Sequence, residues 1–237
     1  MRTKGFIFAA GLGTRLKPLT ERVPKALVKL DGKPLIDHVV EKFVGCGITD
    51  ITVNVHHFPD LIIEHLRNMD TEARFTISDE RAFLRDTAGG LKFAMPFLSG
   101  CDSVLLYNVD IISDIDLGRL IDFHRASGND ATLAVRHRET SRYFTFDRES
   151  MRLTGWLNKN TGERIGGGAP DREEMMAFSG IHVINTSFAE QIPTVEKCSF
   201  TRFYLEKYGS NKICAFVHDG GNWFDVGKFE QFRDRLS

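Results

Sequence analysis

The sequence predicts an α/β fold, with a doubly wound, mainly parallel (Rossmann-like) sheet, helices on both of its faces and a small mixed β insertion. Three observations lead to this prediction. Apolar runs of strand length alternate with amphipathic helical patterns through residues 1–136, as in a parallel sheet with crossover helices. The first of these runs leads directly into closely spaced glycines at positions 11 and 13. After residue 136, strand patterns follow one another without full helical patterns between them.

The first half of the chain is expected to alternate strands and helices. Pro34 opens a helical pattern whose apolar residues fall on one face, and Gly45-Cys46-Gly47 ends it. Three more helices are expected at 59–69, 86–98 and 117–126. The expected strands are short apolar runs, at Gly5–Ala10, Ile51–Val55, Phe75–Ile77, Val104–Tyr107 and Ala131–Val135.

The second half is expected to form a smaller mixed part that closes over the first. Its predicted strands and helices are, in chain order, strands at 143–146, 153–157 and 178–184 and helices at 200–208 and 228–236. Between Asn158 and Arg172, glycines and polar residues predict a mobile loop. No internal repeat is visible. We therefore expect a single domain over 1–237, with halves 1–136 and 137–237.

Charge is balanced over the whole chain but not along it. The chain has 31 Lys and Arg against 32 Asp and Glu, which argues against a nucleic-acid partner. Residues 1–33, however, carry eight basic and two acidic side chains, so their net charge is +6 and that of the remaining chain is −7. A local excess of this size predicts an anionic ligand near the N-terminal segment.

Cysteine spacing and the lack of long apolar stretches predict a cytoplasmic protein. The four cysteines form no C-x-x-C pair and no disulfide framework, as is usual for reduced thiols. The apolar run after the basic N-terminus is too short for a signal peptide. No stretch reaches the length of a membrane span, so we expect no membrane partner.

The most informative segment is the glycine-rich stretch after the first predicted strand. Its closely spaced glycines expose backbone N–H groups that can hold phosphate oxygens. Leu16 breaks the dinucleotide motif G-x-G-x-x-G, and no Lys-Ser or Lys-Thr follows to complete a P-loop. The alternative is a plain glycine turn. The cations that follow, Arg15, Lys17 and Lys25, favour a phosphate site, because a triphosphate needs both bidentate and point-charge partners.

Two carboxylates are candidates for a metal site. Asp110 follows the apolar strand at 104–107, and an open parallel sheet binds its ligands beyond that end of the strands. The alternative for Asp110 is a turn residue. Asp225 precedes the last predicted helix, so its alternative is a helix N-cap. The histidines show no metal-binding spacing, and no nucleophile elbow is present.

The run from Ala9 to Ile36 resembles the signature of the sugar-1-phosphate nucleotidyltransferases, also called nucleoside-diphosphate-sugar pyrophosphorylases. Its paired glycines, Thr-Arg-Leu, Pro-Leu-Thr, Pro-Lys and Lys-Pro stand in the family order. The resemblance implies the nucleotide-diphospho-sugar transferase-like fold, with 1–136 as the nucleotide-binding half and 137–237 as the sugar-binding and closing half. It implies catalytic roles for Arg15, on the departing pyrophosphate, and for Lys25, on the α-phosphate or the incoming sugar phosphate. The implied nucleotide contacts are Ala10, Gly11, Gly13, Thr14, Arg15, Gly89 and Gly90.

The same resemblance implies a metal site and a sugar site. Asp110 and Asp225 are the implied ligands of Mg²⁺, a cation that takes hard oxygen donors and keeps several waters. Where many relatives carry Glu-Lys-Pro, this chain has Asn158-Lys159-Asn160, so Lys159 is either a sugar-phosphate ligand or a surface lysine. The resemblance also implies that Glu80 contacts either the sugar or the base of the nucleotide. The implied sugar-side contacts are Glu80, Asn108, Lys159 and Gly180.

The implied reaction joins an NTP and a sugar 1-phosphate into an NDP-sugar and releases pyrophosphate. The likeness is greatest to small members that act as mannose-1-phosphate guanylyltransferases or N-acetylmuramate-1-phosphate uridylyltransferases, which implies a role in cell-envelope precursor synthesis. Two alternatives remain open: cytidylyl transfer to a non-sugar phosphate such as phosphocholine, and a non-catalytic subunit that senses nucleotide sugars. The base, the sugar and the oligomeric state also remain open. Because the sequence runs only a short way past Asp225, we expect no C-terminal hexapeptide β-helix.

Overall fold

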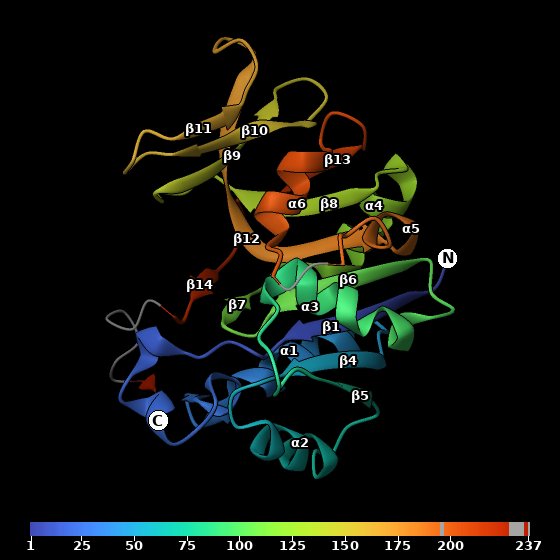
Figure 1. Ribbon diagram of the computed structural model, residues 1–237, viewed down its shortest axis with the longest axis vertical. Coiled ribbons are helices and arrows are strands. Elements are labelled where there is room, and N and C mark those ends of the chain that lie inside the picture. Colours follow the sequence, from blue (N-terminus) through green and yellow to red (C-terminus); the bar gives the residue numbers. More distant parts are fainter. Residues whose placement is uncertain (195–196, 228–234, 237) are drawn as a thin grey trace.

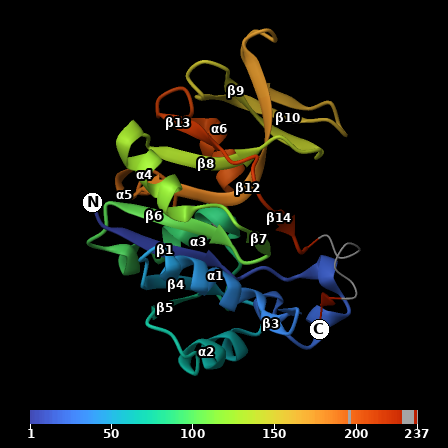
Figure 2. The ribbon, with the colours of Figure 1, turned by 180° about the vertical axis from the view of Figure 1, so that it is seen from behind.

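The computed structural model describes residues 1–194, 197–227 and 235–236. Its centre is a ten-stranded mixed sheet with helices packed on both faces (Figures 1 and 2). The prediction of a doubly wound α/β fold with a mixed β part is confirmed.

The first half of the chain builds the parallel part of the sheet. The strand nearest the N-terminus is central, and its neighbours on both sides run parallel to it. All four strands correspond to predicted ones and differ from them by a few residues at their ends. They are, in spatial order, β6 (Ser103–Asn108), β1 (Thr3–Phe8), β4 (Asp50–Val55) and β5 (Arg74–Asp79).

Helices connect these strands, and residues next to the helix ends determine where some of the helices begin. One begins directly after Pro34, whose fixed φ suits a helix start. Another is capped by Asp116, whose carboxylate accepts the N–H of Arg119 at 2.9 Å. None of the helices in the described part of the chain has the length and apolar character needed to cross a bilayer. The helices of this half are α1 (Leu35–Gly45), α2 (Pro59–Arg67), α3 (Asp86–Ala94), which continues into a 3₁₀ turn (Met95–Leu98), and α4 (Leu117–Ser127).

The second half adds mainly antiparallel strands to this core. Its longest strand, β12 (Glu173–Asn185), has 13 residues and pairs with β6 at one end. It also pairs with β8 (Ala131–Arg136), the predicted last strand of the first half. The other strands are β9 (Arg142–Asp147), β10 (Leu153–Asn158), β11 (Arg164–Gly166) and β13 (Ile213–Val217), which runs parallel to β8. The path through the sheet is β11-β10-β9-β12-β6-β1-β4-β5, with β8 on β12 and β13 on β8. Two helices, α5 (Thr186–Ala189) and α6 (Phe200–Lys207), complete this half.

Two apolar cores lie on opposite faces of the sheet. The first packs α1, α2 and α4 against the parallel strands and contains the edge-to-face pair Phe43 and Tyr107. The second packs α3 and α6 against the other face and contains Phe203 and Tyr204. Because both faces are covered, the central strands β1 and β6 carry buried apolar runs, Phe6-Ile7 and Val104–Tyr107, which explains why such runs can be recognised in the sequence.

The segment 158–172, predicted to be a mobile loop, is partly ordered as β11. The reason is the side chain of Glu173, which is only 8% exposed. Its carboxylate accepts hydrogen bonds from the Thr154 hydroxyl at 2.8 Å and from the N–H of Gly168 at 2.7 Å, and it forms an ion pair with Arg164. This buried anion holds the hairpin closed, and no local pattern in the sequence indicates it.

The sequence did not predict strand β13, the short helix α5 or four short strands. The short strands are β2 (Lys29–Leu30) with β3 (Lys33–Pro34), and β7 (Ile111–Ser113) with β14 (Trp223–Asp225). The predicted helix 228–236 lies outside the described residues except for its last two. Of these, Leu236 forms an antiparallel bridge with Leu30.

Candidate active site

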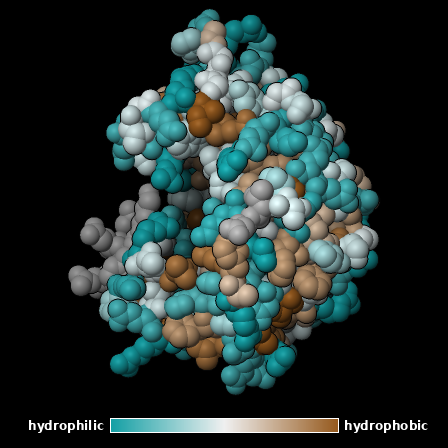
Figure 3. All heavy atoms as spheres, in the orientation of Figure 1, coloured by the Kyte–Doolittle hydropathy of each residue, from teal (hydrophilic) through white to brown (hydrophobic). Residues whose placement is uncertain are grey.

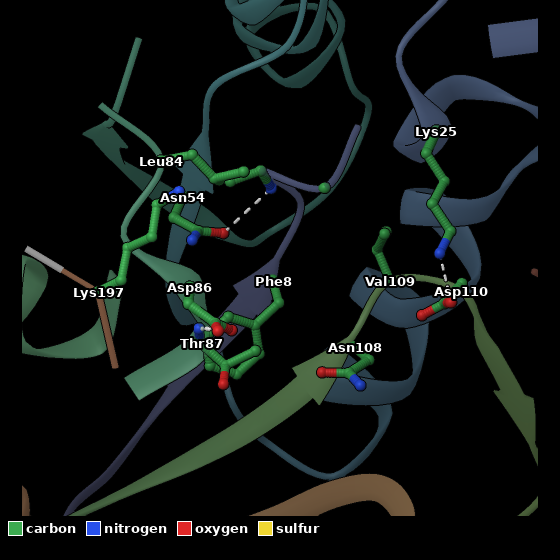
Figure 4. Close-up of a pocket in the computed structure, with 12 residues that line it drawn as sticks. Phe8, Lys25, Asn54, Leu84, Asp86, Thr87, Asn108, Val109, Asp110 and Lys197 are labelled. Atoms are coloured by element: carbon green, nitrogen blue, oxygen red, sulfur yellow. Dashed lines mark hydrogen bonds and ion pairs between the residues drawn. The ribbon is translucent and has the colours of Figure 1, made fainter. Parts of the chain in front are cut away.

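A cavity of about 360 Å³ lies at the carboxyl ends of β1, β4 and β6 (Figure 4). Open α/β sheets bind their ligands at this edge. In the space-filling view the molecule is hollowed between the part that carries β9 and β10 and the part that carries β1 (Figure 3). The predicted site residues that line the cavity are Ala10, Gly11, Lys25, Asn108 and Asp110.

The glycine loop follows β1, and Gly13 determines its shape. Gly13 has φ +63°, a left-handed conformation that favours glycine, and a Cβ there would lie 2.7 Å from Cγ2 of Thr20. The Thr20 hydroxyl and the N–H of Leu16 both donate to the Gly13 carbonyl at 2.8 Å. Gly11, by contrast, lines the cavity and has open space at its Cβ position. The loop therefore turns back at Gly13 and presents Gly11 to the cavity, while Thr14 lies exposed beside the turn.

Two cations and two carboxylates gather at one end of the cavity. The Lys25 ammonium contacts Oδ2 of Asp110, and each of these side chains is only 12% exposed. Arg15 lies near both carboxylates, with Nη2 3.8 Å from Asp110 Oδ2 and Nη1 3.5 Å from Asp225 Oδ2. Its side chain is 60% exposed, so the guanidinium is open to a ligand. The structure thus brings together four residues that the sequence singled out.

Asp110 and Asp225 meet because a short ladder holds their backbones side by side. Asp110 lies between β6 and β7, and Asp225 ends β14, where it is paired with Ile111 of β7. The N–H of Val226 donates to the Asp110 carbonyl at 2.9 Å. On the outer side of β14, the guanidinium of Arg138 stacks over the Trp223 ring at 4.1 Å. These contacts join two segments that are more than a hundred residues apart in the sequence.

The two carboxylates share one electrostatic environment. Burial raises the pKa of Asp225, and the negative charge of Asp110 raises it further, while Arg15 and Lys25 oppose the rise. Two facing carboxylates fit Mg²⁺, which in phosphate-binding enzymes takes one or two protein carboxylates and completes its shell with waters and phosphate oxygens. Over residues 1–194, 197–227 and 235–236, no group of three or more His, Cys, Asp or Glu side chains gathers as a closed metal cage.

Gly89 and Gly90, the predicted nucleotide contacts at the start of α3, are buried against protein groups. The N–H of Gly89 donates to the Cys198 carbonyl at 3.0 Å, and a Cβ at Gly90 would lie 2.7 Å from Oε1 of Glu80. Close packing therefore explains this glycine pair, which otherwise costs helix stability. Glu80, the predicted sugar or base contact, is 2% exposed and does not line the cavity. Direct contacts of these three residues with a ligand stay predictions.

On the predicted sugar side, the structure brings Asn108 and Gly180 together and leaves Lys159 apart. Gly180 lies at a bulge in β12 with φ +76°, and a Cβ there would lie 2.9 Å from Nδ2 of Asn108. This glycine makes room for the Asn108 side chain, which lines the cavity. Lys159 is exposed in the turn after β10, with its ammonium 4.7 Å from the centre of the Tyr143 ring, and it is not part of the lining.

Sequence reasoning missed about half of the cavity lining. Asn54 had a readable signal, because this polar residue stands between Val53 and Val55 near the end of β4, and the structure shows it only 3% exposed. Asp86 has φ +64°, a strained conformation that cannot be seen in the sequence. The lining residues that were not predicted are Phe8, Asn54, Leu84, Asp86, Thr87, Val109 and Lys197.

The chain matches a protein-family model, and it is similar in sequence or in fold to several known proteins. A sequence model of the family described as Nucleotidyl transferase matches residues 4–236. The mannose-1-phosphate guanyltransferase of Debaryomyces hansenii is 33% identical over 239 residues, and the chain spans only 62% of that protein's length while 97% of the chain is covered. The N-acetylmuramate alpha-1-phosphate uridylyltransferase of Caulobacter vibrioides is 43% identical over 119 residues, which cover 49% of each chain. The crystal structure of HddC from Yersinia pseudotuberculosis, complexed with GMP-PN, has the same fold, with a TM-score of 0.77, 21% identity and coverage of 99% of this chain and 98% of that one.

Proposed function

Because the chain belongs to the nucleotidyl transferase family, we propose that it transfers a nucleoside monophosphate from an NTP to a sugar 1-phosphate, forming an NDP-sugar and releasing pyrophosphate. One observation carries the proposal: Arg15, Lys25, Asp110 and Asp225 gather at one end of a cavity bordered by the glycine loop. Two cations suit a polyanionic substrate, and two carboxylates suit the metal ion that accompanies a triphosphate.

The proposed mechanism is an in-line displacement at the α-phosphorus. An oxygen of the sugar phosphate attacks, and pyrophosphate leaves from the opposite side. Arg15, the most exposed of the four side chains, contacts the departing pyrophosphate, and Lys25 contacts the α-phosphate or the incoming phosphate. The attacking phosphate is already ionised at neutral pH, so no general base is needed. Asp110 and Asp225 would hold Mg²⁺, which supplies positive charge to the phosphates when it is bound.

In this proposal the chain's own residues act by positioning and charge neutralisation. The glycine loop from Ala10 to Thr14 wraps the triphosphate, so residues 1–136 form the nucleotide half. Asn108 of the first half and Gly180 of the second face the acceptor, and residues 137–237 form the sugar-binding and closing half. Lys25 also contacts Asp110, so one cation of the site neutralises one of its carboxylates.

For the substrates, we propose two pairs, GTP with mannose 1-phosphate and UTP with N-acetylmuramate 1-phosphate, in cell-envelope precursor synthesis. The support is that both relatives named above carry the corresponding activities in their names. We also propose that the chain works in the reducing cytoplasm, because all four cysteines are free thiols. Cytidylyl transfer to phosphocholine and a non-catalytic sensing role are the alternatives that the experiment must separate.

A substrate matrix tests the proposal. GTP, UTP, CTP and dTTP are each combined with a panel of sugar 1-phosphates and with phosphocholine, in the presence of Mg²⁺, and pyrophosphate release is measured. We expect release with one or a few sugar 1-phosphates. Release with phosphocholine alone would favour cytidylyl transfer, and nucleotide-sugar binding without any release would favour the sensing role.

Asp110→Asn is the matched site variant. We expect it to lower turnover by about a hundredfold to a thousandfold while the fold is retained, because one of two carboxylates facing the metal loses its charge. Asp122→Asn is the control, since Asp122 is exposed on α4 and, within the described part of the chain, its one ion-pair partner is Arg125 at 3.8 Å. Near-wild-type turnover of Asp110→Asn with every active pair would contradict the metal assignment.

A further inference from the structure

A chain of buried hydrogen bonds links the glycine loop to the start of α3. Oδ1 of Asn54 accepts the N–H of Ala9 at 2.8 Å and that of Ala10 at 3.3 Å. Nδ2 of Asn54 donates to Oε1 of Glu80 at 2.7 Å, and Oε2 of Glu80 accepts the N–H of Arg85 at 3.2 Å. Four segments thus share one network: the loop after β1, the strand β4, the end of β5 and the turn that leads into α3.

Burial makes each bond in this network depend on the others. Asn54 is 3% exposed and Glu80 is 2% exposed. A carboxylate buried to this degree is costly unless donors face it. Burial raises the pKa of Glu80, and the hydrogen bonds from Asn54 and from the N–H of Arg85 oppose that rise. Because one end of the Asn54 amide accepts from two backbone groups and the other donates to Glu80, the amide has only one satisfied orientation.

Gly90 closes the network on the side of α3. A Cβ at this position would lie 2.7 Å from Oε1 of Glu80 and 2.9 Å from Nδ2 of Asn54, so the helix backbone packs directly against the pair. Asn54 lines the cavity (Figure 4), as does Ala10, whereas the buried Glu80 is not part of the lining. The network therefore reaches the substrate surface through the amide of Asn54 and the backbone of Ala10.

We propose that Asn54 and Glu80 are positioning residues for the nucleotide, which hold the backbone of Ala9 and Ala10, and with it the glycine loop, in register with α3. The identity of the ligand rests on the proposed function. This assignment gives Glu80 an indirect role instead of a direct contact with a sugar or a base. A loop that is already ordered needs no further ordering when phosphates bind, so loss of the network should weaken nucleotide binding and leave the sugar phosphate unaffected.

The test reverses the polarity of the hydrogen bond between the two side chains. Asn54→Asp sets two buried carboxylates against each other, and Glu80→Gln turns an amide NH₂ toward a donor. In the double variant Asn54→Asp/Glu80→Gln, the new carboxylate accepts from Ala9, from Ala10 and from the new amide, whose oxygen accepts from Arg85. The bond between the two side chains is then restored with opposite polarity, while the three backbone bonds and the net charge of the pair are kept.

Two measurements separate nucleotide binding from turnover. Calorimetry with GTP and with UTP gives nucleotide affinity directly, and steady-state kinetics give KM for each substrate. We expect each single variant to lose about tenfold to a hundredfold in nucleotide affinity, with the sugar-phosphate KM unchanged, and the double variant to recover most of the loss. Asn211→Asp is the matched control: its Nδ2 lies 3.2 Å from Asp130 Oδ2, outside the cavity lining, so it also creates a carboxylate pair and should leave nucleotide affinity unchanged.

The outcomes are distinct. Wild-type nucleotide affinity in both single variants would overturn the inference. A double variant as weak as the singles would also overturn it, in favour of direct contact between Glu80 and the ligand. An equal change in both KM values, together with a lower melting temperature, would show a purely structural role and overturn it too. If Asn54→Asp does not fold, Glu80→Gln and the double variant carry the test. A wild-type chain that binds nucleotide and releases no pyrophosphate would overturn the proposed function and leave the calorimetric test valid.

Discussion

The buried imidazole of His182 makes stability depend on pH in a way that can be worked out from its surroundings. His182 lies in β12, is 2% exposed, and its Nδ1 is 2.6 Å from the Tyr204 hydroxyl. The rings of Phe178 and Phe200 pack edge-on against it, with centroids 5.3 and 4.6 Å away. Burial in this apolar setting lowers the pKa of His182 to about 3. In the unfolded chain the imidazole titrates at about 6.5.

The sign and the size of the effect follow from these two values. The folded chain keeps His182 neutral, whereas the unfolded chain takes up a proton as the pH falls, so stability is full above about pH 6.5 and is lost below it. At about pH 5 the loss corresponds to about 1.5 pH units, or about 2 kcal/mol in the free energy of unfolding. This figure holds for any folded-state pKa well below 5. Burial, together with the positive charge of Arg136, lowers the pKa of His218 to about 4. His218 therefore adds a similar loss of stability at about pH 5.

Urea unfolding of the wild type and of His182→Gln, at about pH 7.5 and about pH 5, measures this effect. The variant has its own stability, so only the difference between the two pH values is compared. We expect the wild type to lose about 2 kcal/mol more than the variant between these pH values. His218→Gln should reduce the loss of unfolding free energy between the two pH values by a similar amount. An equal loss in the wild type and in His182→Gln would refute the reasoning, because His182 would then titrate alike in the folded and unfolded chain.

Three further predictions concern the site itself. Lys25→Met removes the ammonium that contacts Asp110, so Mn²⁺ should bind the nucleotide-free chain about tenfold more tightly by calorimetry, and unchanged affinity would contradict competition between the two cations. Gly180→Ala adds a methyl 2.9 Å from Asn108 in a backbone with φ +76°, and it should raise the sugar-phosphate KM and lower the free energy of unfolding by about 1–3 kcal/mol. Gly13→Ala, at φ +63°, should cost a similar amount in urea unfolding and raise the nucleotide KM, and an unchanged urea midpoint would contradict the argument.

The fold and one side of the site could be predicted because local patterns determine them. The buried faces of α1 and of the parallel strands are continuous in the sequence, so their periods can be recognised without any knowledge of their partners. Arg15 and Lys25 belong to a single contiguous motif. Asp110 follows a clearly apolar strand, and its place at the ligand-binding edge follows from the rule for parallel sheets.

The remaining parts of the site depend on contacts between distant segments. β7 and β14 have three residues each, too few to show a period, so the meeting of Asp110 with Asp225 could be expected only from resemblance. Glu80 follows Ser78-Asp79 in a polar stretch of sequence, yet Asn54 and α3 cover it. In the same way, Glu173 orders a segment whose composition predicts a loop. Buried charges of this kind are satisfied by tertiary partners, and no local pattern indicates them.

Strand β12 also limits how the two halves can move. Its part from Ile181 to Asn185 is hydrogen-bonded to β6 in the core, and its part from Glu173 to Met176 is hydrogen-bonded to β9 in the outer hairpins. The register of the β12–β8 ladder shifts between these parts, at the bulge that contains Gly180. We therefore expect any bend between the outer hairpins and the core to occur at this bulge, against the β8 pairing that continues on both sides of it. Since the bulge adjoins Asn108, such a bend would change the acceptor side of the cavity first and the glycine loop least.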